Sequence, residues 1–108
     1  MGAPEVTDAT FEKEVLQSPV PVLVDFWAAW CGPCRAAGPA IAALALEFEG
    51  KAKVVKVNVD TNKVFAAKFG VKGIPNFVIF NAGIPVDQLV GWNDETGLAL
   101  QAALSKLL

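Results

Sequence analysis

Cys31 and Cys34 are the only cysteines of this 108-residue chain, and Gly32 and Pro33 separate them. A Cys-x-x-Cys pair where a strand meets a helix is typical of a redox-active dithiol. Amides in the first turn of a helix present free N–H groups and positive partial charge, which stabilise a thiolate. We therefore predict that Cys31, just before the helix, is an exposed nucleophile. Cys34, in the first turn, is expected to resolve the mixed disulfide.

Two other uses of the cysteine pair are less favoured alternatives. A structural disulfide that closes a loop of about four residues would stabilise the fold by only ~2 kcal/mol, and such bridges are rare in the cytosol. A zinc site would need four ligands, but the chain has two cysteines and no histidine. Zinc binding and Cys–His catalysis are therefore not expected, and thiol–disulfide exchange is the favoured chemistry.

Asp25 interrupts the apolar, valine-rich run from Val20 to Trp27. Such a run is typical of a central strand covered on both faces, where an unpaired carboxylate has a raised pKa. One interpretation is a general base that takes the proton from Cys34. The other is a carboxylate at a strand end that faces water or pairs with Lys56, because structural ion pairs also perturb pKa values.

The apolar pattern predicts strands and helices that alternate along the chain. Strands are expected at 20–27, 54–59, 76–81 and 86–91, and helices between 7 and 18 and at 33–49, 62–69 and 95–108. Residues before position 7 are expected to add an edge strand. This order predicts an α/β fold in which helices cover both faces of a central mixed sheet.

Side-chain positions within these helices are also predicted. Thr7 or Asp8 is expected to cap the first helix. In the long helix, Ile41, Leu44 and Phe48 form an apolar stripe at i, i+3 and i+7. In the last helix, three residues are expected to face the core: Leu98, Ala102 and Leu104.

Composition limits the function classes. The chain is 54% hydrophobic and 19% charged, with a net charge of −2, which argues for one compact domain and against disorder or nucleic-acid binding. The longest apolar stretch, 36–46, is too short to span a membrane. The N-terminus lacks the pattern of a secretory signal, so a cytoplasmic location is expected.

The segment from Val24 to Arg35 resembles the active-site segment of the thioredoxin family. The likeness covers essentially the whole chain through four further landmarks in order: Pro39, Lys56, Gly73-Ile74-Pro75 and Val90-Gly91. The sequence departs from the family at Asn76, where threonine is common, and at Trp92, where a small residue is common.

The resemblance implies a single thioredoxin domain over residues 1–108. It implies a protein-disulfide reductase that carries electrons in cell redox homeostasis and is re-reduced by a thioredoxin reductase. Such a protein acts on disulfide-containing client proteins as a monomer, without a bound cofactor or metal. The Gly-Pro pair between the cysteines is typical of the reductants of the family. A disulfide oxidase or isomerase domain, and a binding module with incidental cysteines, are the alternatives.

The resemblance also implies roles for individual residues. The catalytic set is Cys31, Cys34, Asp25 and Lys56, with Asp25 as the proton shuttle. A cis bond before Pro75 would leave the Ile74 backbone free to pair with an extended client chain. The expected apolar docking surface is formed by Trp30, Gly32, Pro33, Ile74, Pro75, Gly91 and Trp92.

Overall fold

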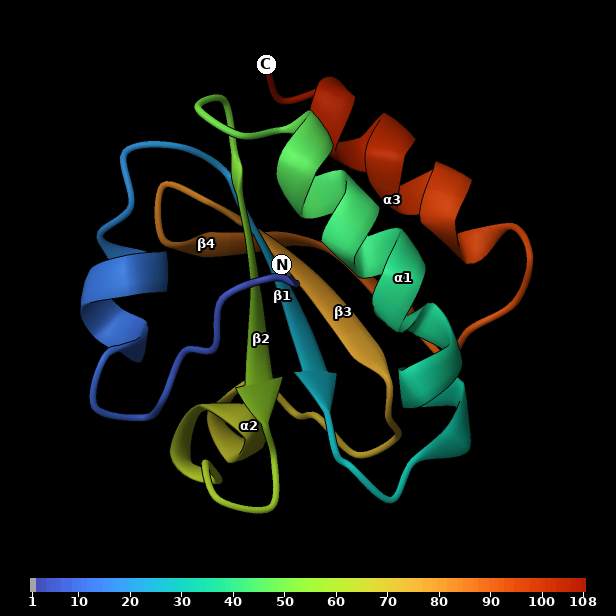
Figure 1. Cartoon of the computed structure of the whole chain (residues 1–108). Helices are drawn as coiled ribbons and strands as arrows, with labels where there is room; N and C mark the ends of the chain where they lie inside the picture. Colours follow the sequence, from blue (N-terminus) through green and yellow to red (C-terminus); the bar gives the residue numbers. More distant parts are fainter. Residues whose placement is uncertain (1) are drawn as a thin grey trace.

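Helices and strands alternate in the computed structural model, which describes residues 2–108 (Figure 1). The elements are η1 (Glu12–Leu16), β1 (Val22–Trp27), α1 (Gly32–Glu47), β2 (Lys53–Asn58), α2 (Val64–Lys68), β3 (Asn76–Asn81), β4 (Ile84–Val90) and α3 (Thr96–Ser105). The four strands and four helices predicted after position 7 are present, with bounds that differ by a few residues at most ends. No helix in residues 2–108 has the length and apolar character needed to cross a membrane.

The four strands form one mixed sheet in the order β2-β1-β3-β4. β1 runs parallel to β2 and antiparallel to β3, and β4 is antiparallel to β3. The expected N-terminal edge strand is reduced to a single parallel bridge between Glu5 and Lys56. At this bridge the Val6 amide donates to the Lys56 carbonyl at 2.7 Å, and the Lys56 amide donates to the Pro4 carbonyl at 2.8 Å.

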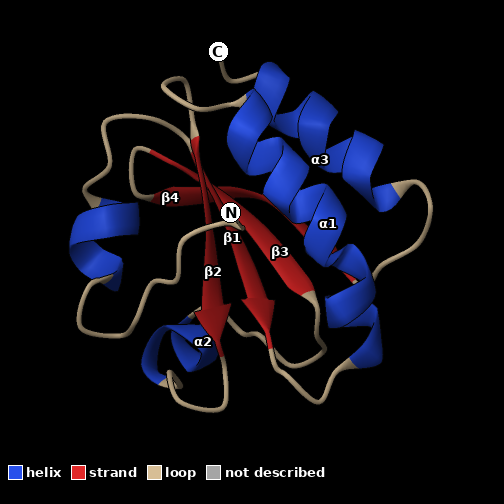
Figure 2. Cartoon of the chain, in the orientation of Figure 1, coloured by secondary structure: helices blue, strands red, loops and turns tan. Residues whose placement is uncertain are grey.

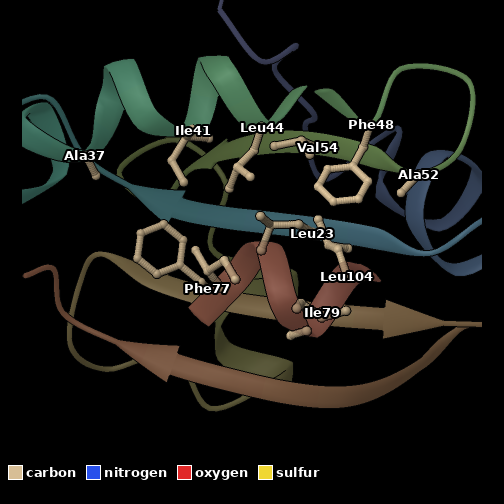
Figure 3. Packing of buried hydrophobic residues seen from close by; sticks show 12 residues of the cluster. Leu23, Ala37, Ile41, Leu44, Phe48, Ala52, Val54, Phe77, Ile79 and Leu104 are labelled. Atoms are coloured by element: carbon tan, nitrogen blue, oxygen red, sulfur yellow. The ribbon is translucent and has the colours of Figure 1, made fainter. Parts of the chain in front are cut away.

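Helices cover both faces of the sheet, as predicted: α1 and α3 lie on one face, and η1 and α2 lie on the other (Figure 2). Alternate residues of β1 supply the two cores, since Leu23 packs under α1 whereas Val22 and Val24 pack on the opposite side. The predicted stripe of α1 is confirmed, because Ile41, Leu44 and Phe48 are all buried. Figure 3 shows these residues packed with the sheet residues Leu23, Val54, Phe77 and Ile79.

The predicted inward face of α3 is wrong in two of its three positions. Leu98 is 71% exposed and Ala102 is also exposed, whereas Leu100, Ala103 and Leu104 are buried. Successive residues of an α-helix are rotated by roughly 100°, so Leu98 lies on nearly the opposite side of α3 from Leu100. The buried stripe runs through positions 100 and 104, four residues apart.

The first helix is not capped as predicted. Its N-cap is Phe11, and no side chain caps it. The Asp8 carboxylate instead accepts hydrogen bonds from the Val64 amide at 3.1 Å and the Phe65 amide at 3.5 Å, at the start of α2. The Asp8 amide donates to the Asn62 side-chain oxygen at 2.9 Å, which holds it there. Thr7 is not the cap either.

Candidate active site

Cys31 and Cys34 form a disulfide at the N-terminus of α1, with their Cα atoms 5.2 Å apart. Cys31 is the N-cap residue of α1, and its sulfur accepts a hydrogen bond from the Cys34 amide at 3.2 Å. The Cys31 amide donates to the Ala28 carbonyl at 3.1 Å, which fixes the turn between β1 and α1. A free helix amide therefore points at the Cys31 sulfur, in the position where it would stabilise a thiolate.

The expectation that Cys31 is exposed is wrong for this disulfide form. Cys31 is 4% exposed and Cys34 is 3% exposed. The two cysteines pack with a small apolar cluster that also contains Trp27, Ala28, Val59 and Ile74. Both cysteines are almost fully buried in this cluster, so burial does not distinguish them. Their positions relative to α1 do distinguish them, because Cys31 caps the helix and Cys34 lies in its first turn.

The Asp25 carboxyl group is fully buried, so it does not face water. Neither of its oxygens has a hydrogen-bond partner within residues 2–108. The pKa of Asp25 is raised from 3.8 to about 7, and burial is the largest cause. The Lys56 charge acts to lower this pKa, and the Glu5 charge acts to raise it. Desolvation dominates because the carboxylate form has lost its water without gaining a hydrogen bond.

Lys56 is the register partner of Asp25 across β1 and β2. Its ammonium nitrogen nevertheless lies over the Trp27 ring, 4.3 Å from the ring centroid. A cation in this position is attracted by the face of the ring. The Lys56 side chain thus lies next to Asp25 on the sheet, while its charge is directed to the tryptophan two residues farther along β1.

The loop around Trp30 is held by two side chains that the sequence did not single out. Trp30 is 68% exposed, and its indole N–H donates to the Asp60 carboxylate at 3.2 Å. The Arg35 guanidinium donates to the Ala29 carbonyl at 2.9 Å. One signal could have identified Asp60: it follows β2, and the carboxyl ends of the parallel strands β1 and β2 meet at one edge of the sheet.

The peptide bond between Ile74 and Pro75 is cis. Ile74 packs against the cysteine cluster, and its backbone forms no hydrogen bond with any residue the structure describes. The Pro75 carbonyl accepts from the Gly91 amide at 2.7 Å. Gly91 has a φ of +88°, a backbone conformation that favours glycine. The expected cis bond is therefore confirmed, and the Ile74 backbone stays the predicted pairing site.

The structure brings most of the predicted docking residues around the disulfide. Gly32 and Pro33 are exposed in the first turn of α1, whereas the Pro75 ring is buried. Trp92 differs from the others. Its ring lies 6.1 Å from the Phe77 ring, centroid to centroid, and it packs against the core under α1 and α3. The partly buried indole of Trp92 therefore packs against the helix-covered core and does not belong to the cysteine cluster.

Comparison with known proteins gives one consistent result. A family model described as Thioredoxin matches residues 2–104. Thioredoxin 1 of Nostoc sp. is 53% identical over 98 residues, which cover 91% of this chain and 92% of that protein. The thioredoxin of Porphyra purpurea is 50% identical over 84% of this chain and 85% of its own length. The thioredoxin of Synechocystis sp. is 49% identical over 91% of this chain and 92% of its own length.

Proposed function

Because this chain belongs to the thioredoxin family and is a thiol–disulfide oxidoreductase that reduces protein disulfides, we propose that Cys31 attacks and Cys34 resolves. The observation that carries the assignment is the hydrogen bond from the Cys34 amide to the Cys31 sulfur. A helix amide stabilises negative charge on the sulfur at the N-cap. The thiolate is the attacking species in exchange, so the capping cysteine is the better nucleophile.

The cycle ends in the disulfide state of the structure. In the dithiol form, the Cys31 thiolate attacks one sulfur of the client disulfide and breaks that bond. The departing client thiolate takes up a proton, and a mixed disulfide joins Cys31 to the client. Cys34 then loses its proton and attacks the Cys31 sulfur, which forms the internal disulfide and releases the second client thiolate. Two electrons pass to the client, and its two sulfurs are protonated.

Asp25 is the proposed acceptor of the Cys34 proton. A general base works best when its pKa lies near the operating pH, and the pKa of Asp25 is raised to about 7. Its oxygens hold no hydrogen bonds with residues of the described chain, so a proton gained from Cys34 displaces none. The role proposed for Lys56 is electrostatic, since its charge favours the ionised form of Asp25 before the transfer.

The proposed docking surface pairs an extended client chain with the Ile74 backbone. Exposed Trp30, Gly32 and Pro33 would contact the side chains next to the client disulfide. The hydrogen bond between the Gly91 amide and the Pro75 carbonyl would fix the shape of the main chain beside the bound client. Strand pairing of this kind depends little on client sequence. For Trp92 we propose an indirect role, through its packing against Phe77 and the core under α1 and α3.

The remaining proposals concern the setting of the reaction. A thioredoxin reductase is the proposed electron donor, and no bound cofactor is required because electrons arrive through protein thiols. The cytoplasm is the proposed compartment, since cytosolic pools keep thiols reduced. Residues 1–108 are proposed to act as one monomeric thioredoxin domain.

Trapping of mixed disulfides tests the assignment of the cysteines. Cys34→Ser should accumulate covalent complexes with client proteins, because attack proceeds while resolution is blocked. Cys31→Ser should accumulate none, and the double variant is the background control. Non-reducing gel electrophoresis followed by reduction measures the adducts. Adducts through Cys34 in the Cys31→Ser variant, at the level seen for Cys34→Ser, would reverse the two roles.

A further inference from the structure

A buried side-chain amide lies at the start of β3, directly after the cis-proline. Asn76 is 1% exposed, and its side-chain oxygen accepts a hydrogen bond at 2.9 Å from the Gln88 side chain of β4. A buried polar group destabilises a fold unless it has a partner. Gln88 is exposed and belongs to the edge strand β4, so the pair links a buried position of β3 to the outer strand of the sheet (Figure 1). Asn76 is also a position where the sequence departs from the thioredoxin family.

The register of the two strands explains why these side chains meet. β3 and β4 are antiparallel, with Asn76 opposite Val90 and Val78 opposite Gln88. Val78 packs in the core on the face that η1 and α2 cover. Residues two apart on a strand, and residues opposite each other on neighbouring strands, share a face. Asn76, Gln88 and Val90 therefore lie on the same face as Val78, and Asn76 and Gln88 are diagonal neighbours within reach of each other.

A β-bulge separates this end of β4 from the hairpin turn. The register shifts between Ile79 and Phe80, which leaves Val86 as an extra residue on β4. Because of this shift, the geometry of the turn does not by itself fix the pairing at the far end of the two strands. Within residues 2–108, the Asn76–Gln88 hydrogen bond is the only one between side chains of β3 and β4, and it lies on the far side of the bulge from the turn.

The end of β4 contacts the cis-proline loop at two points. The Gly91 amide donates to the Pro75 carbonyl at 2.7 Å. A Cβ atom added to Gly73 would lie 3.2 Å from a methyl carbon of Val90, so the Val90 side chain packs closely on the backbone of the loop. Ile74 lies between these two contacts and packs with the cysteine cluster. A shift of β4 along β3 would therefore move the backbone on both sides of Ile74.

We propose that Asn76 and Gln88 are positioning residues of the client-docking site, and that they act through the end of β4 on the loop that carries Ile74. The inference rests on the proposed pairing of a client chain with the Ile74 backbone. The hydrogen bond holds β4 in register, which keeps the loop in the shape that a client strand meets, so less ordering is required when the client binds. A small disulfide without a peptide chain does not use this pairing. The pair therefore favours protein clients over small disulfides.

Hydrogen exchange at the Gly91 amide measures the effect on the loop directly. Gln88→Ala removes the donor and leaves the core intact, because Gln88 is exposed. In the oxidised full-length chain, Gly91 should then exchange about 2- to 10-fold faster, as expected when one hydrogen bond is lost. Gln88→Glu keeps a partner to which the Asn76 amide can donate, so exchange should stay near the wild-type rate. Gln101→Ala, which removes a side-chain hydrogen bond to Glu47 instead, is the matched control and should change Gly91 exchange little.

Reduction of two disulfides of different size tests the consequence for clients. The probes are insulin, whose disulfides lie within peptide chains, and dithiobis(nitrobenzoic acid), a small aromatic disulfide, with dithiothreitol as the reductant. Gln88→Ala should raise the KM for insulin by about 3- to 10-fold and change kcat little, because the pair affects docking of the client backbone and not the sulfurs. The rate with the small disulfide should stay at the wild-type value. Gln88→Glu should restore the KM for insulin. Equal losses with both disulfides would contradict a role in client docking.

A second variant and the two readouts together separate this inference from the proposed function. The effect of Gln88→Ala on Gly91 exchange should disappear when Asn76→Val is already present, and an undiminished effect would overturn the pair. If exchange becomes faster and the KM for insulin rises, both proposals hold. If exchange becomes faster and the KM does not change, the pair holds the loop as inferred, while clients do not pair with the Ile74 backbone. If Gly91 exchange does not change, the inference is refuted, whatever the kinetics with insulin show.

Discussion

Replacement of Asp25 by alanine should slightly destabilise the fold at acid pH and stabilise it at alkaline pH. In the folded protein the pKa of this buried carboxyl is raised from 3.8 to about 7. Below pH 3.8 Asp25 is mostly protonated in both the folded and the unfolded state, so its ionisation does not lower the free energy of unfolding. As the pH rises, the unfolded state ionises first, and the wild-type protein loses stability until the pH passes about 7.

The size of this loss follows from the two pKa values. A difference of about 3 corresponds to on the order of 4 kcal/mol, which accumulates between pH 4 and pH 8. Alanine removes that cost but leaves a small cavity, which should destabilise the fold by about 1 kcal/mol. Asp25→Ala should therefore be slightly less stable than wild type at pH 4. At pH 8 it should be more stable by about 2 to 3 kcal/mol.

Urea denaturation of the oxidised wild type and variant at a series of pH values from 4 to 9 measures the difference. Asp94→Ala, which removes an exposed carboxylate, is the control and should follow wild type at every pH. The same Asp25→Ala variant should resolve mixed disulfides more slowly, by up to the ~10²–10⁴-fold typical of a lost general base. A stability difference that stays constant from pH 4 to 9 would refute the reasoning about the buried charge.

Three further predictions concern packing, capping and redox poise. Leu100→Ala should destabilise the fold by about 2 to 5 kcal/mol, whereas Leu98→Ala should change the free energy of unfolding by less than about 0.5 kcal/mol, both by urea denaturation. Equal effects would contradict the observed face of α3. Asp8→Ala should cost about 1 kcal/mol and speed amide exchange at Val64, while unchanged exchange would refute the cap. Equilibration with glutathione should give a reduction potential nearer to ~−270 mV than to ~−180 mV. The first is the general reference value for thioredoxins, and the second is that of protein disulfide isomerase. A value at the isomerase end would refute the reductant reading.

Strands and the long helix were predictable because their signals are local. The strand at 76–81 has the predicted bounds, and Ile41, Leu44 and Phe48 identify a single buried stripe. In α3, leucine or alanine occupies most positions, so several stripes fit the pattern equally well. Which stripe is buried depends on how α3 lies on α1, and residue periodicity does not contain that information.

The candidate site likewise has some features that follow from nearby residues and others that depend on the assembled fold. The strand, the turn and the helix around the cysteines follow from nearby residues, as does the carboxylate within an apolar strand. The burial of Cys31 depends on Val59 and Ile74, which come from distant parts of the chain. The hydrogen bond between Trp30 and Asp60 likewise joins residues 30 positions apart. Contacts of this kind arise from the assembled sheet, and spacing along the chain does not reveal them.

The contact between Asp8 and α2 bears on the order in which the chain folds. α2 has only five residues, and helices that short do not persist alone in water. The carboxylate that satisfies its first amides comes from 56 positions earlier, so the cap requires closure of a long loop. Contacts with large sequence separation form slowly and late. We therefore expect α2 to form only after the sheet has assembled, and not to act as its nucleus.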